Sequence, residues 1–377
     1  MSYRRSTSIA LTAAFLLIIA GVPLSRAVIE ITRGEYPTVA GLFQHLPTKA
    51  NLRQFEKHLE STAWVVNQTR PWMQLLRYAV LHETGRDTLL GRDGWLFFRP
   101  GVRYLVEPLT PPKEGGDPLT AILAFKEELD ARQIALLVVP VPGKASIYPE
   151  HLTCRAKDYD APVNPHTRAF IARLRECGVE ALDLSEVFRQ SGRGELYLAQ
   201  DSHWSPEGMK LAAETVASYV CERGWVAHGA VPYSERPAPI ERLGDLLLMM
   251  QAPPIERLFQ PEDVDCQQVV RTDSGELYED DPVSKVLVLG DSFLRIYQID
   301  EPGAAGFSAH LARNLGMPVS SIISDGGAST LVRQELARNP ELLENTGVVI
   351  WEFVERDLRF GTEGWQTVKL PEASAPR

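Results

Sequence analysis

The feature that most restricts the fold is an alternation of apolar runs and amphipathic helical segments over residues 134–353. Ile134–Val139 is a continuous apolar run, which is typical of a strand buried on both faces of a parallel sheet. Further strands are predicted at Val179–Leu184, Lys285–Leu289, Val319–Ile323 and Gly347–Phe353, and helices at His166–Cys177, Ser205–Arg223, Phe307–Leu315 and Leu331–Ala337. Strands that alternate with helices form an open, mostly parallel sheet covered on both faces. The sequence therefore predicts a three-layer α/β domain.

Other segments flank and interrupt this alternation. Trp95–Phe98 is predicted to be a strand and Pro118–Gln133 a helix, from their apolar patterns. Residues 225–284 are rich in proline and are predicted to be an irregular insertion. We place the α/β domain at residues 84–362 and a loose C-terminal tail at residues 363–377.

The N-terminus carries a targeting signal. Basic residues precede an apolar run, Ile9–Leu24, which would span about 24 Å as a helix against roughly 30 Å of hydrocarbon. Residues 1–27 are therefore predicted to be either a cleaved signal peptide or a membrane anchor. Residues 28–83 have apolar side chains at helical spacing and are predicted to be helical, with a new helix beginning at Pro71.

The charge balance excludes one class of partner. Lys and Arg number 39 and Asp and Glu number 49, so the net charge is −10. An acidic chain is a poor general binder of nucleic acid, and we expect no nucleic-acid partner. If the substrate is anionic, a local group of cations must overcome the overall repulsion.

The four cysteines allow more than one interpretation. Cys154, Cys177, Cys221 and Cys266 have no CxxC spacing, which argues against a zinc or thioredoxin-like site. Outside the cytoplasm, one or two structural disulfides would be expected, in any of three connectivities. Buried free thiols are the alternative.

A candidate nucleophile follows the predicted strand Lys285–Leu289. The segment Gly290-Asp291-Ser292-Phe293 begins at the carboxyl end of that strand, where ligands bind in open α/β sheets. A glycine and a turn there can present the Ser292 hydroxyl and leave backbone N–H groups free, as a nucleophile with an oxyanion hole requires. The tripeptide Gly-Asp-Ser at a strand end also serves as a plain turn or helix cap, so the motif alone leaves both interpretations open.

A candidate acid–base pair lies in Asp201-Ser202-His203-Trp204, just before a predicted helix. Residues two apart in an extended segment point to the same side. Asp201 can therefore accept a hydrogen bond from His203 Nδ1 and leave Nε2 free to act as a base. Because no third ligand has a recognisable spacing, we predict no metal at this pair.

Other candidate site residues are less specific. Gly326 and Gly327 follow the strand predicted to end at Ile323 and can supply an oxyanion N–H, although a plain turn explains them equally well. Arg356 can bind a substrate carboxylate through two parallel bonds, or pair with an aspartate. Trp351 can stack on a sugar ring, or belong to the core.

Together these motifs resemble a known family. GRDGWLFF, VPVPGKASIYPEHL, DSHW, LVLGDSF and WEFVERDL occur here in the order found in AlgJ/AlgX-type alginate O-acetyltransferases, and the likeness covers roughly residues 50–360. The resemblance implies an SGNH-hydrolase-like domain in the periplasm that acetylates hydroxyls of an exopolysaccharide. The family's Asp-x-His motif matches Asp201 and His203, and its nucleophile matches Ser292. The Asp-His pair precedes the serine, as in this family, and no asparagine matches the usual SGNH oxyanion donor.

The resemblance also implies partners. AlgJ-like members keep an N-terminal inner-membrane anchor and AlgX-like members add a carbohydrate-binding module, so we expect the AlgJ type. The acetyl donor would be delivered by a membrane-bound O-acyltransferase, and no cofactor is required. Two alternatives remain: a carbohydrate acetyl-esterase with the same triad, and a non-catalytic carbohydrate-binding scaffold of an envelope assembly.

Overall fold

The structure is a computed structural model that describes residues 2–41, 48–62, 64–108, 116–156, 164–360 and 364–371. It divides into two compact units. The first comprises Met1–Glu83 with Gln251–Phe259, and the second comprises Thr84–Met250 with Gln260–Arg377. The short segment 251–259 therefore belongs with the N-terminal unit, although the sequence analysis assigned it to the insertion of the α/β domain.

The first unit is helical. Its helices are α1 (Ser2–Thr32), α2 (Thr38–Gly41), α3 (Lys49–Thr62), α4 (Trp64–Leu81) and α13 (Pro253–Glu256). Pro71 lies inside α4, so the prediction that it begins a new helix is wrong. Tyr78 of α4 packs against Phe259, with ring centroids 6.4 Å apart, which joins the distant segment 251–259 to this unit.

Helix α1 is longer than the apolar run that the sequence indicated. Within it, Leu11–Thr32 is long and apolar enough to cross a membrane, judged by length and composition alone. Its 22 residues span about 33 Å at the usual helical rise, which matches a hydrocarbon core of roughly 30 Å. The helix therefore has the length of an anchor, and it also fits an export signal near the N-terminus.

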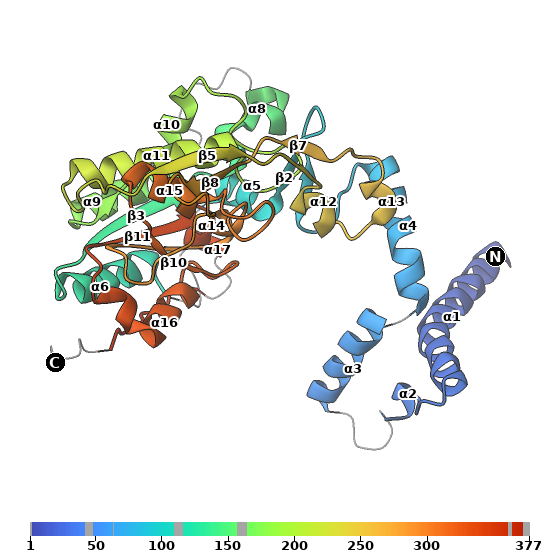
Figure 1. The fold of residues 1–377 in the computed structure, drawn as a ribbon. Helices are drawn as coiled ribbons and strands as arrows, with labels where there is room; N and C mark the ends of the chain where they lie inside the picture. The colour runs from blue at the N-terminus through green and yellow to red at the C-terminus, as the bar shows by residue number, and fades with distance from the viewer. Residues whose placement is uncertain are drawn as a thin grey trace. The chain divides into compact units, whose positions relative to one another are not determined.

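The second unit is built on one parallel sheet (Figure 1). The strand order is β10-β9-β11-β3-β4, and every neighbouring pair is parallel. The strands are β3 (Ala135–Val141), β4 (Glu180–Ala181), β9 (Val286–Gly290), β10 (Ser320–Ile323) and β11 (Val348–Val354). The predicted strand at Val179–Leu184 is thus reduced to two residues.

Helices cover both faces of this sheet, which confirms the three-layer prediction. Alternate residues of β3 enter two separate cores: Leu137 and Val139 on one face, Leu136 and Val138 on the other. The first core is shared with α10 (Leu184–Gln190), α11 (Pro206–Glu222) and α15 (Phe307–Leu315), and the second with α6 (Pro118–Asp130), α9 (Pro165–Glu176) and α16 (Leu331–Arg338). Figure 1 shows α6 and α16 on one side of the sheet and α10 and α11 on the other.

Local sequence signals explain several of these boundaries. Ser205 caps α11 by accepting a hydrogen bond from Gly208 N–H at 3.2 Å, and Pro206 follows at the first helical position. Gly316 ends α15 with a positive φ of 65°, a conformation that glycine adopts without strain.

The segment 225–284 is more ordered than predicted. It forms two antiparallel ribbons, β5 (Tyr233–Pro237) with β8 (Gln267–Arg271), and β6 (Ile240–Arg242) with β7 (Glu262–Val264). A short helix, α12 (Asp245–Met249), follows β6. Prolines lie at the ends of these pieces, so the high proline content marks turns rather than disorder.

Shorter elements complete the second unit. They are β1 (Thr88–Leu90), β2 (Leu96–Phe98), α5 (Arg99–Val106), α7 (Lys144–Ile147), α8 (Pro149–Leu152), η1 (Cys154–Ala156), α14 (Ser292–Arg295), η2 (Pro340–Leu343) and α17 (Asp357–Phe360). Strands β1 and β2 form an antiparallel ribbon that includes the predicted strand at Trp95–Phe98.

The C-terminal segment and the cysteines also differ from expectation. Trp365 and Leu370 are buried in the second core, so the prediction of a loose tail is wrong for residues 364–371. Residues 361–363 and 372–377 lie outside the described part of the chain. All four cysteines are free thiols, and only Cys266 is buried.

Candidate active site

The sheet presents Ser292 at its carboxyl edge. Strand β9 ends at Gly290, Asp291 caps α14 by accepting from Phe293 N–H at 2.8 Å, and Ser292 is the first helical residue. The other carboxylate oxygen of Asp291 accepts from Val354 N–H of β11 at 3.1 Å. A side chain at Gly290 would collide with Glu352 and Leu294, so this tight turn requires glycine. The nucleophile candidate is therefore fixed by the two central strands of the sheet.

His203 reaches Ser292 from a different part of the chain. His203 Nε2 lies 2.8 Å from Ser292 Oγ, and His203 Nδ1 lies 2.6 Å from Asp201 Oδ1. Asp201 is fully buried and His203 is 5% exposed, whereas Ser292 remains partly accessible. The structure thus brings the three predicted residues into one hydrogen-bonded chain whose serine end is open to a ligand.

The acid–base pair precedes α11, as predicted, and it does not follow a strand of the parallel sheet. Residues 200–203 form bends between Tyr197 and Trp204, which make an isolated antiparallel bridge. Asp201 Oδ1 also accepts from the backbone N–H of His203 at 3.1 Å, so a local turn joins the two residues.

The buried Lys144 and the partly buried Glu262 fasten this loop to the rest of the unit. Lys144 Nζ donates to the carbonyl oxygens of Leu96, Ala199 and Asp201 at 2.6, 2.7 and 3.0 Å. Glu262 of β7 accepts from the backbone N–H groups of Ala199 and Gln200, both at 2.7 Å. The loop is therefore held by contacts with residues more than 50 positions away in the sequence.

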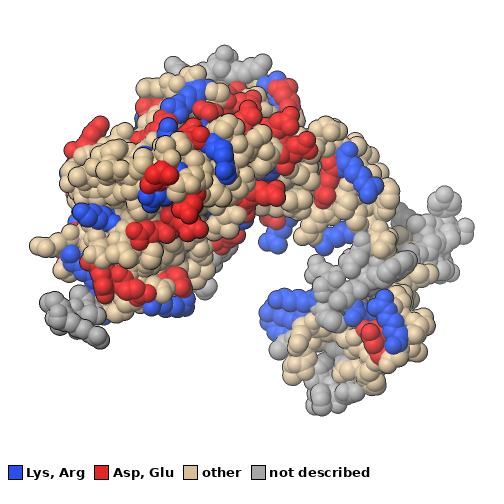
Figure 2. All heavy atoms as spheres, in the orientation of Figure 1, with Lys and Arg blue, Asp and Glu red and all other residues tan. Residues whose placement is uncertain are grey.

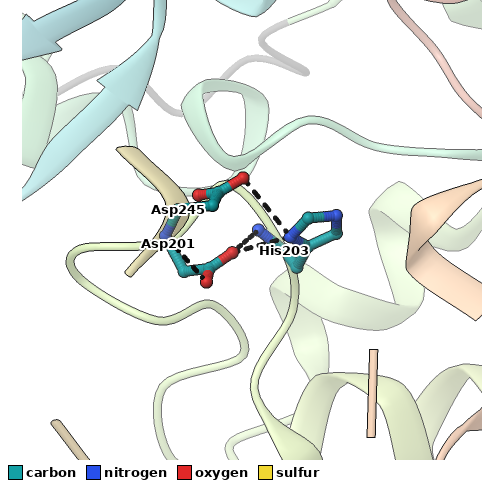
Figure 3. A group of neighbouring side chains, drawn as sticks. All are labelled: Asp201, His203 and Asp245. Atoms are coloured by element: carbon teal, nitrogen blue, oxygen red, sulfur yellow. Dashed lines mark hydrogen bonds and ion pairs between the residues drawn. The ribbon is translucent and has the colours of Figure 1, made fainter. Parts of the chain in front are cut away.

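Two further side chains contact the pair directly, and the sequence analysis did not find them. Arg242 Nε donates to Asp201 Oδ2 at 2.9 Å, and Asp245 N–H donates to the same oxygen at 3.1 Å. Figure 3 shows the Asp245 carboxylate on the same side of His203 as Asp201, with Asp245 Oδ2 3.6 Å from Nδ1. Both residues come from the segment predicted to be an irregular insertion. No sequence signal marked them, since a lone Arg and Asp in a proline-rich stretch are common.

The charges around the pair set its protonation. Burial alone would raise the pKa of Asp201, but the adjoining His203 and Arg242 outweigh it and hold that pKa well below its usual range. Burial alone would lower the pKa of His203, but Asp201 and then Asp245 outweigh it and raise that pKa, with Arg356 opposing them. Asp201 is thus ionised, and His203 is a stronger base than a free histidine.

The Asp201–His203–Asp245 group has residue types that bind metals, with ligand atoms within 4.8 Å of one another. These atoms already have partners. Asp201 accepts from His203, Arg242 and Asp245, and both oxygens of Asp245 accept from Ser202, at 2.7 Å from N–H and 2.6 Å from the hydroxyl. A guanidinium cation on Asp201 also competes with a metal cation there. The arrangement suits proton transfer, and we assign it no metal.

The remaining predicted site residues, apart from Arg356, have structural roles. Trp351 is fully buried, donates to Ala328 O at 2.8 Å and packs on Phe125, so the prediction that it stacks on a sugar is wrong. Gly327 donates its N–H to Ser324 O at 2.9 Å, so that N–H is not available to an oxyanion, and Gly326 has a φ of 65° in the same turn. Both glycines therefore act in a turn.

Arg356 remains a candidate for substrate binding. Its guanidinium lies over the Phe98 ring at 4.8 Å, and it lines a small cavity together with Lys144 and Ser202. Among the described residues it forms no ion pair. It is therefore a cation beside the acid–base loop with no carboxylate partner in the described part of the chain.

Comparisons with known proteins assign the fold and the family. Residues 88–355 match the family model described as an SGNH hydrolase-like domain, acetyltransferase AlgX. The chain belongs to this family. It is 24% identical over 332 residues to the probable alginate O-acetylase AlgJ of Pseudomonas aeruginosa, covering 82% of this chain and 80% of the relative. It is 28% identical over 302 residues to AlgJ of Pseudomonas fluorescens, covering 76% and 72%.

Solved structures agree on the fold. The O-acetyltransferase domain of Pseudomonas putida AlgJ superposes with a TM-score of 0.56 at 23% identity, over 72% of this chain and 91% of that domain. Pseudomonas aeruginosa AlgX gives a TM-score of 0.54 at 21% identity, over 71% of this chain and 62% of AlgX. The expected SGNH-like fold and the resemblance to AlgJ are thus confirmed.

Proposed function

We propose that this protein is an exported O-acetyltransferase that moves an acetyl group through Ser292 onto a polysaccharide hydroxyl. The observation that carries the proposal is the continuous chain from Ser292 Oγ through His203 to Asp201, with distances of 2.8 and 2.6 Å. Such a chain is the arrangement by which a serine is activated for acyl transfer. Family membership supplies the acyl group, because the matched domain is described as an acetyltransferase.

The reaction has two halves. In the first, His203 Nε2 takes the Ser292 proton while Oγ attacks the acetyl carbonyl of the donor. The tetrahedral intermediate collapses, the donor leaves with that proton, and Ser292 carries the acetyl group. In the second, His203 takes the proton of a sugar hydroxyl, the sugar oxygen attacks the acetyl carbon, and Ser292 leaves with the proton. Ionised Asp201 stabilises the imidazolium formed in each half.

The oxyanion of each intermediate needs hydrogen-bond donors. The Ser292 N–H is the first N–H of α14, and none of the described residues accepts from it. Helices leave their first N–H groups without internal partners. We assign this N–H as one donor, in place of Gly326 and Gly327.

The acceptor is proposed to be alginate or a similar acidic polysaccharide, because the relatives are named alginate O-acetylases. On the face drawn in Figure 2, acidic side chains form the larger coloured areas of the α/β unit and basic ones are interspersed. A polyanion must therefore meet its cations locally. Arg356, which has no carboxylate partner in the described chain, is the cation we assign to a uronate carboxylate near the site.

The N-terminal helix and the family support a proposal for the cellular location and for the acetyl donor. We place the α/β unit in the periplasm, with α1 as a signal or an inner-membrane anchor. A membrane-bound O-acyltransferase would bring the acetyl group across the membrane from the cytoplasmic side. Such a donor is needed because, in this proposal, Ser292 lies outside the cytoplasm.

The test uses the full chain in detergent with a chromogenic acetyl ester. We expect release of the chromophore and, after rapid quenching, an acetyl adduct on the peptide that contains Ser292. Ser292→Ala should lose both signals while keeping the circular dichroism and melting temperature of the wild type. Full activity in Ser292→Ala would refute the mechanism.

The acceptor decides between a transferase and the alternative of an acetyl-esterase. Adding alginate oligosaccharides should divert acetyl groups from acetate to sugar ester, measured by mass spectrometry of the products. Acetate alone at all acceptor concentrations would favour the esterase. An acetyl-free Ser292 peptide together with sugar binding would favour a non-catalytic scaffold.

A further inference from the structure

We infer that Arg242 and Asp245 are positioning residues that hold Asp201 and His203 in the reactive arrangement. They act through the acid–base pair and do not touch the reacting atoms. The inference rests on the proposed function, because it assigns their role through that pair. The inference goes beyond the proposed function because it gives the segment between α11 and β8 a part in the chemistry.

Arg242 and Asp245 fix the orientation of the Asp201 carboxylate. Asp201 Oδ1 faces Nδ1 and the backbone N–H of His203, at 2.6 and 3.1 Å. Asp201 Oδ2 is occupied by Arg242 Nε at 2.9 Å and by Asp245 N–H at 3.1 Å. With donors on both oxygens the carboxylate cannot rotate without breaking a bond on each side. Because Asp201 is fully buried, no water is at hand to replace a lost donor.

Asp245 also fixes the turn that carries His203. Its carboxylate accepts the backbone N–H of Ser202 at 2.7 Å and the Ser202 hydroxyl at 2.6 Å. Ser202 is the residue between Asp201 and His203. Asp245 therefore contacts Asp201 through its N–H and Ser202 through its carboxylate, and it lies 3.6 Å from His203 Nδ1. Three consecutive residues of the loop are thus tied to the start of α12.

Arg242 is held in place by a second contact. Its Nη1 lies 4.0 Å from Asp300 Oδ2, while its Nε lies on Asp201. The guanidinium side chain is 18% exposed, so the ion pair with Asp201 is largely shielded from water. A charged hydrogen bond in such surroundings is stronger and more directional than one on the surface.

The charged groups around His203 come from several elements. Asp201 lies on the same loop as His203, Asp245 lies in α12, and Arg356 follows the end of β11. Helix α14 contributes the uncharged side chains of Ser292 and Phe293. Lys144 of α7 and Arg242 of β6 reach Asp201 rather than the imidazole. The negative charge of Asp245 favours the imidazolium form of His203. Removing that charge must lower the pKa of His203.

The test compares Arg242→Gln and Asp245→Asn with the wild type in the full chain, using the acetyl ester. Arg271→Gln is the matched control, because it removes an arginine of the same segment from an exposed ion pair with Asp273. For Arg242→Gln we expect kcat to fall by about tenfold to a hundredfold with little change in KM, as a misplaced catalytic group produces. For Asp245→Asn we expect the acid limb of kcat/KM to move to lower pH. Arg271→Gln should match the wild type.

A second measurement does not depend on turnover. The imidazole signals of His203 are followed by NMR against pH in wild type and Asp245→Asn, with His203→Gln used to assign them. We expect a lower pKa of His203 in Asp245→Asn. An unchanged pKa, together with wild-type kcat in both variants, would overturn the inference.

The outcomes separate this inference from the proposed function. Loss of kcat with a matching loss of thermal stability, and with no change in pH profile or in the His203 titration, would indicate a purely structural role and overturn it. If the wild type shows no Ser292-dependent ester cleavage, the proposed function fails, and the NMR titration still decides whether Asp245 acts on His203.

Discussion

The proposed nucleophile and the proposed acid–base pair are positioned in opposite ways. Ser292 stands at the end of β9, and its turn is fixed by residues of β9, α14 and the neighbouring β11. Asp201 and His203 stand on a loop and are fixed by side chains of α7, β6, β7 and α12. The nucleophile thus depends on backbone register, and the pair depends on a network of buried charges.

The two sides also use buried carboxyl groups differently. Glu352 lies beneath the nucleophile turn, and burial together with nearby Asp291 raises its pKa well above the usual range, which favours the neutral acid. Asp201 is equally buried but remains ionised because His203 and Arg242 adjoin it. Burial alone therefore does not set the charge of a carboxyl group here; the partners do.

Replacing Ser292 or His203 should have the largest effect on kcat. The loss should be the same whichever of the two sides is altered. Ser292→Ala and His203→Ala are each expected to reduce kcat by roughly 10⁴-fold or more, since both act in one proton transfer. The double variant should be no worse than either single one. Steady-state rates on the acetyl ester measure this, and additive losses would mean that the two residues act independently.

Lys144→Met tests the network that holds the pair. The three carbonyl oxygens around Nζ match the three N–H bonds of an ammonium group, although burial lowers the pKa of Lys144 to about 7. Methionine fills similar space but removes the Nζ donor from all three oxygens. Ala199 O keeps its hydrogen bond from Leu96 N–H, and an oxygen left without a donor costs about 1–3 kcal/mol. We expect a clearly lower denaturation midpoint and reduced kcat. A variant as stable as the wild type would show that the loop needs no such anchor.

The pH dependence should report on the charges of the acid–base side. Nearby carboxylates raise the pKa of His203, so kcat/KM should fall with decreasing pH through a value above that of a free histidine, as the base becomes protonated. Arg356 opposes this shift. Arg356→Gln should therefore move the acid limb to higher pH, opposite to Asp245→Asn. Movement of both variants in the same direction would contradict the charge arrangement.

The smallest effect is expected on the nucleophile side. Glu352→Gln replaces a carboxyl group whose raised pKa favours the neutral acid with an amide of the same shape, and the amide oxygen can still accept from Asp291 N–H. We expect kcat within about twofold of the wild type and stability within about 1 kcal/mol. Asp201→Asn makes the same change on the other side and should cost roughly 10⁴-fold. Equal losses in the two variants would remove the distinction between the sides.

The same contrast explains what could be predicted from the sequence. The run Lys285–Leu289 followed by glycine and serine is a local pattern, and the strand, the turn and Ser292 were all found from it. Asp201 and His203 were found because they are two residues apart and resemble a family motif. Arg242, Asp245 and Lys144 were missed because their roles depend on contacts across 41 to 57 positions, which no local pattern records.

Misassigned residues show the same limit. Trp351 stands near the end of the last strand, where a ligand would bind, but the alternation of faces along β11 directs it into the core with Leu289 and Phe353. Gly326 and Gly327 also follow a strand, yet their turn uses the Gly327 N–H internally. Position at a strand end is therefore not sufficient to make a residue part of the site, and Asp201 and His203 show that it is not required either.

The place of β11 in the sheet has a consequence for how the protein matures. Among the described strands it comes last in sequence, yet it lies at the centre, pairs with both β9 and β3, and alone joins them. Residues 348–354 must first emerge from the ribosome and insert between β9 and β3. Until then, the part of the sheet that carries Ser292 and the part that contains β3 are not joined. The sheet can therefore close only after residues 348–354 have inserted. The turn that carries the proposed nucleophile Ser292 acquires its hydrogen bond from Val354 N–H to Asp291 only at that step.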